Sequence, residues 1–140
     1  MLRAFMLVAI LASAFLMTAC EGDDGGVVRI RERMFATQVM HIYANFGDYL
    51  GRDIQLEGLF LKQYWDELFY FVLRFMPDDC CGGAIGFEVK WPDGSTEEIP
   101  EDGAWVQATG RLQIDVGLNL YLELSSLNVL ERRGAEIVTR

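Results

Sequence analysis

Alternating apolar and polar positions along most of the chain predict β-strands. The clearest case lies at residues 118–124, where four leucines alternate with Asn119, Tyr121 and Glu123. Comparable runs, some almost wholly apolar, cover residues 54–65, 68–76, 84–91, 105–112 and 118–126. Gly58 and Gly110 interrupt two of these runs, as expected where a strand bends to turn the corner of a small barrel.

An amphipathic helix is predicted before the first of these strands. Apolar residues recur at the spacing of one helix face, at Phe35, Val39, Ile42, Tyr43 and Phe46. Asn45 and Gly47 are suitable residues to end this helix. The fold class expected is therefore mainly β, a small five-stranded barrel preceded by one N-terminal amphipathic helix.

The N-terminus has the pattern of an export signal rather than of a folded element. A short positive start ending at Arg3 precedes the apolar run 4–17, which is too short to span a bilayer comfortably. Residues 16–20, Leu-Met-Thr-Ala-Cys, resemble a bacterial lipobox, in which the cysteine is lipidated and becomes the new N-terminus. We expect lipidation at Cys20; the alternative is an ordinary secretory signal in which this cysteine is incidental.

This interpretation divides the chain into three parts. Residues 1–19 are a lipoprotein signal peptide, residues 20–27 are an acidic, glycine-containing tether, and residues 28–140 are one folded domain. The expected location is the bacterial cell envelope, with the domain held by lipid on the extracytoplasmic face of a membrane.

Charge narrows the classes of partner. The whole chain carries −9, and removal of residues 1–19 leaves 11 basic against 21 acidic residues, a formal charge of −10. Such a chain repels phosphate backbones and anionic lipid, which argues against nucleic acid as a partner. Attachment to a membrane is therefore expected through lipid on Cys20 rather than through a basic patch.

The candidate chemistry lies in the loop 77–83, Pro-Asp-Asp-Cys-Cys-Gly-Gly. The candidate residues for a metal site or a disulfide are Asp78, Asp79, Cys80 and Cys81. Thiolates bind Zn²⁺ or Cu(I), and Glu88 could join the aspartates as an oxygen ligand to zinc. Adjacent cysteines are unfavourably spaced for this, because the usual metal signature has two residues between its cysteines. A vicinal disulfide and a buried reduced pair are equally good interpretations, so the cofactor stays open between zinc and none.

No catalytic residues are predicted. Phosphate-binding glycine loops, a nucleophile elbow and a Cys-x-x-Cys motif at a helix start are all missing from the sequence. His41, the single histidine, is interpreted as a partly exposed helix-surface residue rather than a metal ligand. Trp65, Trp91 and Trp105 could line a ligand-binding face, although core or rim positions are the preferred interpretation.

Two stretches resemble known proteins. Residues 43–58, Tyr-Ala-Asn followed by Tyr-Leu-Gly-Arg-Asp-Ile-Gln-Leu-Glu-Gly, resemble the helix-to-strand junction of small exported OB-like domains. The Cys80-Cys81 loop after an Arg-Phe strand, with Trp-Val-Gln-Ala-Thr-Gly at 105–110, resembles the extracytoplasmic domain of a family of uncharacterised bacterial membrane proteins. Members usually carry N-terminal membrane helices and pair with a permease-like protein. The family has a loose link to metal homeostasis.

This resemblance covers residues 34–130 and implies an OB-like barrel on the extracytoplasmic side, with a membrane-protein partner. The chain departs from the family in its lipoprotein signal, and in Gly82-Gly83 where the family often has Ala and Asp. The expected function is a non-catalytic binding or accessory module anchored to the membrane. The alternative is a metal-handling (zinc or copper) or thiol-redox-responsive protein that acts through Cys80 and Cys81.

Overall fold

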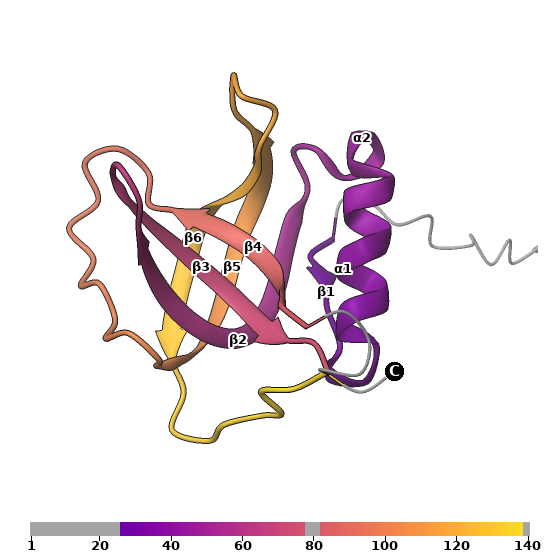
Figure 1. Ribbon diagram of the computed structural model, residues 1–140. Helices are drawn as coiled ribbons and strands as arrows, with labels where there is room; N and C mark the ends of the chain where they lie inside the picture. The colour runs from indigo at the N-terminus through magenta and orange to yellow at the C-terminus, as the bar shows by residue number, and fades with distance from the viewer. Residues whose placement is uncertain (1–25, 78–81, 139–140) are drawn as a thin grey trace, which may run out of the picture.

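The computed structural model describes residues 26–77 and 82–138 (Figure 1). The strands are β1 Val28–Arg29, β2 Asp53–Tyr64, β3 Leu68–Phe75, β4 Ala84–Lys90, β5 Trp105–Ile114 and β6 Leu120–Val129. The helices are the short 3-10 turn η1 Glu32–Met34, then α1 Phe35–Ala44 and α2 Phe46–Tyr49. Within these described ranges, no helix has the length and apolar character needed to cross a membrane.

The fold is mainly β, as predicted, and its six strands form one mixed sheet in the order β1-β2-β3-β4-β6-β5. β2 also pairs with β5, so the sheet curls back on itself into a partial ring (Figure 1). β2 reaches both neighbours because residues 53–59 pair with β5 and residues 59–64 pair with β3. The link between β4 and β6 is short and parallel, joining residues 88–90 to residues 121–123.

Two glycines permit this curvature by letting backbones approach closely. A Cβ atom on Gly58 would lie 2.6 Å from the carbonyl oxygen of Leu73, and one on Gly86 would lie 2.1 Å from that of Val72. β2 and β4 therefore approach β3 more closely than any larger residue would allow. The bend predicted at Gly58 is confirmed, since β2 passes there from β5 to β3.

The inner face of the sheet and the apolar face of α1 share one core. Phe35, Val39 and Ile42 of α1 are buried there. They pack with buried strand residues, among them Ile54, Leu56, Phe60, Val72, Phe87, Val89, Val106, Ala108, Leu112 and Leu122. Burial of this apolar surface is the main source of stability and fixes α1 against the sheet.

The helix ends at Asn45, the first of the two stop residues predicted, although its apolar pattern continues to Phe46. α1 stops at Ala44, and Phe46 belongs to the separate turn α2. Asn45 marks the break, because its side-chain Nδ2 and its backbone N–H both donate to the carbonyl oxygen of His41, at 2.9 and 3.0 Å. His41 itself is exposed, as predicted.

The predicted strands are all present, with one addition. β5 runs two residues further than its pattern predicts, to Ile114. β6 begins at Leu120, two residues later than predicted, because Leu118 lies in the turn at a positive φ, and it ends three residues later, at Val129. β1 is a sixth strand that pairs in parallel with β2 over two residues, Val28 and Arg29. A strand of two residues shows no alternating pattern in the sequence, so β1 can be recognised only from its pairing with β2.

Candidate functional site

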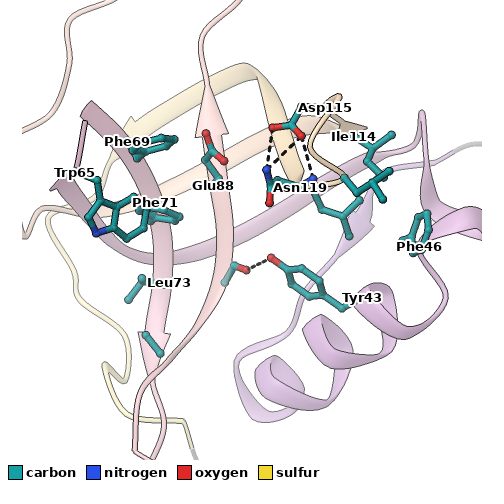
Figure 2. A pocket seen from close by; sticks show the side chains of 14 residues that line it. Tyr43, Phe46, Trp65, Phe69, Phe71, Leu73, Glu88, Ile114, Asp115 and Asn119 are labelled. Atoms are coloured by element: carbon teal, nitrogen blue, oxygen red, sulfur yellow. Dashed lines mark hydrogen bonds between the residues drawn. The ribbon is translucent and has the colours of Figure 1, made fainter. Parts of the chain in front are cut away.

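A groove of about 840 Å³ crosses the outer face of β3 and β4 (Figure 2). Its lining comes from α1, α2, the β2–β3 turn, the two strands and the β5–β6 hairpin. The residues are Tyr43, Phe46, Trp65, Phe69, Phe71, Leu73, Ala84, Gly86, Glu88, Ile114, Asp115, Leu118, Asn119 and Leu120. The groove is open on one side and its lining is mainly apolar, which makes it the candidate binding site.

One wall of the groove is aromatic. Trp65, in the turn between β2 and β3, is 63% exposed, and its ring lies 5.1 Å from that of Phe69 and 6.2 Å from that of Phe71. Alternate residues of a strand face opposite sides, so Phe69 and Phe71 line the groove while Val72 points into the core. The wall therefore offers flat apolar surface with an exposed indole at its rim.

The facing wall comes from the helices and from the hairpin (Figure 2). Tyr43 stacks on Phe87 with 5.2 Å between ring centres, and its hydroxyl donates to the carbonyl oxygen of Gly86 at 2.9 Å. Burial, and to a lesser extent the negative charge of Glu88, raise the pKa of Tyr43. The phenol therefore remains a neutral donor, which fixes α1 beside β4.

Two carboxylates, Glu88 and Asp115, are the charged groups in the described lining. The Lys90 ammonium lies behind them, 3.2 Å from Oε1 of Glu88, 3.8 Å from Oδ2 of Asp115 and 4.4 Å from the centre of the Tyr121 ring. One cation thus faces two anions, so this end of the groove keeps a negative balance.

The hairpin between β5 and β6 is shaped by Asp115. Its Oδ1 accepts the backbone N–H groups of Gly117 at 2.8 Å and Asn119 at 3.0 Å. The hydrogen bond from the Asn119 backbone is the main reason that the pKa of Asp115 is lowered. These bonds hold Leu118 at a φ of 64°, in the left-handed region that bulky residues rarely adopt.

A second polar cluster surrounds Arg74, a residue that the sequence patterns do not single out. Arg74 is 2% exposed. Its Nε donates to the carbonyl oxygen of Glu57 at 3.0 Å, and its Nη1 donates to the carbonyl of Ala135 at 3.0 Å and to Oε1 of Glu32 at 3.2 Å. The guanidinium therefore ties β3 to β2 and to segments near both ends of the described chain.

Aromatic rings enclose the same guanidinium. Its central carbon lies 4.6 Å from the centre of the Phe35 ring and 4.9 Å from that of Trp105. Such stacking favours a planar, weakly hydrated guanidinium over an ammonium. The Arg74 cluster holds the end of β3 in place, next to the cysteine loop.

The predicted site residues Cys20, Asp78, Asp79, Cys80 and Cys81 lie outside the described residues. The base of the cysteine loop is described, and there Met76 N–H donates to the carbonyl oxygen of Gly83 at 2.9 Å. On the other side of β3, Phe75 N–H donates to Glu136, and Val138 N–H donates to Phe75. The loop therefore begins and ends on a fixed base.

The other sequence candidates separate in the structure. Glu88, a proposed oxygen ligand to zinc, faces the groove beside Lys90. No group of three or more His, Cys, Asp or Glu side chains suited to a metal occurs within residues 26–77 and 82–138. Trp105 is in the core and the Trp91 indole donates to Glu97 at the rim, as the preferred interpretation expected. Trp65 instead lines the groove.

Comparison with protein families assigns the chain. The family model of the DUF1980 C-terminal domain matches residues 11–137. The chain belongs to the DUF1980 C-terminal domain family. The groove and the Arg74 cluster both lie within the matched range, so they are parts of the DUF1980 C-terminal domain itself. No curated protein and no solved structure matches the chain.

Membership confirms the predicted resemblance at the level of a family of unknown function. It assigns no reaction, ligand or partner to the DUF1980 C-terminal domain. Those assignments have to come from the groove and from the chemistry of its lining.

Proposed function

We propose that this chain is a non-catalytic binding module of the bacterial cell envelope. Its groove across β3 and β4 would hold an apolar, positively charged peptide segment of a membrane-protein partner. The observation that carries the proposal is the combination, in one groove, of an aromatic wall around Trp65 with two carboxylates, Glu88 directly opposite Phe71 and Asp115 on the hairpin.

The strand pairings support the more specific description of the fold as an OB-like barrel. The ring runs β2-β3-β4-β6-β5 and back to β2, with a parallel link between β4 and β6. OB-folds bind their ligands on the face of the second and third strands, between the loops that follow the first and fourth. Here these parts are β3, β4, the turn with Trp65 and the hairpin with Asp115, which are the parts that line the groove.

The lining favours a basic, apolar peptide over the nucleic acids and sugars that many OB-folds bind. Glu88 and Asp115 repel phosphate, and the chain carries −9 overall. A sugar requires several free polar groups, whereas Asp115 and Asn119 are already bonded to each other. An arginine or lysine side chain would be attracted by the carboxylates and could stack on the exposed Trp65 ring.

The proposed location follows from the N-terminal sequence. Lipid on Cys20 would hold the domain, residues 28–140, on the extracytoplasmic face of a membrane, with residues 20–27 as the tether. A partner in the same membrane would then be present at high effective concentration.

A peptide titration followed by NMR tests the groove. The three tryptophans are three internal probes, because Trp65 lines the groove, Trp91 bonds to Glu97 and Trp105 is buried. The probe is acetyl-Leu-Arg-Phe-Leu-amide, and its matched control has Glu in place of Arg. We expect the Trp65 indole signal to shift with the arginine peptide while the other two indole signals stay unchanged.

Two variants sharpen this titration. Trp65→Ala should abolish binding, and Glu88→Gln should weaken binding of the arginine peptide more than that of an uncharged analogue. Equal binding of the arginine and glutamate peptides, or shifts of all three indole signals together, would contradict the proposal.

A second candidate function, metal handling (zinc or copper) or a thiol-redox response, rests on the cysteine loop. One backbone hydrogen bond, from the Met76 N–H to the carbonyl oxygen of Gly83, joins the described ends of the loop, and Gly82 and Gly83 have φ of 55° and 120°. Two adjacent thiols beside two aspartates, at residues 78–81, are the chemistry that supports this candidate. Native mass spectrometry without chelator or reductant should then show bound metal or a mass lower by two hydrogens, and Cys80→Ser with Cys81→Ser should remove either signal.

A further inference from the structure

The hairpin between β5 and β6 ends in exposed apolar side chains. Val116 is fully exposed and Leu118 is 78% exposed, although Leu118 is also held at a positive φ. Glycine or asparagine is the ordinary residue for such a conformation in a turn. A strained leucine that gains no burial from its own fold is better explained by an apolar surface outside it.

More exposed apolar surface lies at the same end of the molecule. Phe46 of α2 lines the groove together with Leu118, and both are exposed. Leu50 is also exposed and precedes a loop tied to β5, since Gly51 N–H donates to the carbonyl oxygen of Leu112 at 2.9 Å. We call Phe46, Leu50, Val116 and Leu118 the apolar end; in Figure 1 the hairpin and α2 lie together at the top of the molecule.

The N-terminal segment leaves the domain toward this apolar end. Val28 of β1 lies beside Ile54 of β2, which lies beside Gly110 of β5. β1 is parallel to β2, and β2 is antiparallel to β5. Following the chain backwards from Val28 therefore leads in the direction in which β5 runs, to the hairpin.

The direction of the chain, rather than its length, distinguishes the two ends of the sheet. Val28 lies level with Gly110, which is four residues from Ile114 at the hairpin end and four from Val106, the partner of Val129. The chain from Cys20 to Val28 spans at most about 28 Å when fully extended. Because it departs from Val28 toward the hairpin, a lipid on Cys20 would favour an orientation with the apolar end nearer the bilayer.

Charge at the apolar end is only partly balanced. Asp53 is paired with Arg111 at 3.6 Å, whereas Lys90 is shared between Glu88 at 3.2 Å and Asp115 at 3.8 Å. The remaining charge there is negative, so contact with the bilayer is expected through the lipid anchor and the apolar side chains rather than through attraction to anionic lipid.

We propose that the apolar end is a membrane-contact surface, on which Val116 and Leu118 enter the interfacial region of a lipid bilayer. The groove, which Phe46 and Leu118 help to line, then opens beside the membrane, and the segment that it holds is a membrane-proximal one. This inference rests on the proposed lipid anchor at Cys20 and narrows the proposed function to partners at the bilayer surface.

Fluorescence quenching by lipid tests the orientation. A tryptophan is introduced by Val116→Trp and, as the matched control at the far end of β6, by Val129→Trp; Val129 is also exposed. The full chain is reconstituted in vesicles of phosphatidylethanolamine and phosphatidylglycerol that contain phosphatidylcholine with brominated acyl chains. Relative to the unchanged chain, the added emission at position 116 should be blue-shifted and largely lost, and that at position 129 should be unaffected.

Three results would overturn the inference: emission at position 116 that bromine does not quench, equal quenching at both positions, or a chain that does not float with the vesicles. Circular dichroism of both variants excludes misfolding as the cause. The peptide titration of Trp65 is performed without vesicles, so a failure of the groove and a failure of the orientation give different patterns of results.

Discussion

Replacing Arg74 by methionine tests whether its buried guanidinium holds the ends of the chain to the sheet. Methionine fills much of the space between the Phe35 and Trp105 rings but donates no hydrogen bond. The carbonyl oxygens of Glu57 and Ala135 would lose the donors that now lie 3.0 Å from each. The variant therefore removes the polar contacts while it keeps most of the packing.

The expected magnitude follows from the groups left unpaired. A buried acceptor that loses its partner costs about 1–3 kcal/mol, but Glu57 is half-buried and Ala135 is exposed, so water can partly replace the lost donors and the two carbonyls together cost about 2–3 kcal/mol. The ion pair with Glu32 adds little, because that side chain is 56% exposed and water can solvate it after the change. Burying a methionine instead of a charge returns part of this, and we expect Arg74→Met to lower the free energy of unfolding by about 2 kcal/mol.

Urea unfolding followed by circular dichroism measures this loss. The matched control is Arg111→Met, because Arg111 also pairs with a carboxylate, that of Asp53 at 3.6 Å, but is exposed to water. The free energy of unfolding should fall by less than about 0.5 kcal/mol in this control. Arg74→Lys should lie between Arg74→Met and the unchanged chain, since an ammonium cannot reproduce the fork of the guanidinium. Equal losses in Arg74→Met and Arg111→Met would refute the reasoning.

Three further predictions concern single residues. The hydrogen bond from the Ala135 backbone, and to a lesser extent the one from the Arg74 side chain, lowers the pKa of Glu32 from its ordinary 4.5. The ionised Glu32 side chain therefore stabilises the fold above pH 4.5, and this stabilisation is lost as the pH falls through the lowered pKa of the folded state. In urea titrations, the difference in unfolding free energy between the unchanged chain and Glu32→Gln should therefore shrink on acidification. Gly86→Ala should destabilise the fold by about 3 kcal/mol or more in thermal unfolding. Its control, Gly47→Ala, has no atom within 4 Å of the new Cβ and should be neutral or stabilising by up to about 1 kcal/mol. Equal changes in stability in the two variants would contradict the close approach of β4 to β3. Tyr43→Phe should remove a late step from the alkaline absorbance titration of the tyrosines, because burial raises the pKa of Tyr43, and loss of an early step would show the phenol to be solvated.

The strands could be predicted from sequence because their patterns are local. Alternating leucines define β6, and the bend at Gly58 follows from a glycine within a strand pattern. The helix ends at Asn45, one of the two stop residues predicted; the apolar spacing alone, which continues to Phe46, could not choose between them, because the hydrogen bonds of Asn45 are not visible in a periodic pattern.

The sites depended on contacts between distant residues, and sequence patterns carry no signal for these. Arg74 reads as one charged residue at the end of an apolar strand, and its partners lie 42 residues before it, at Glu32, and 61 residues after it, at Ala135. β3 is apolar on both faces, so its pattern cannot tell which rings face the core and which face the groove. The one available signal for the groove was the pair of aromatic residues Trp65 and Phe69 beside a turn.

Site-specific photocrosslinking in native membranes tests the central claim, a groove that binds a membrane-protein segment, most directly. A photoreactive phenylalanine replaces Phe69, which lines the groove, and in a separate control Val129, at the far end of β6. We predict one discrete adduct with an integral membrane protein from position 69, suppressed by the arginine peptide and missing from position 129. Equal adducts from both positions, or an adduct that the peptide does not suppress, would contradict the account.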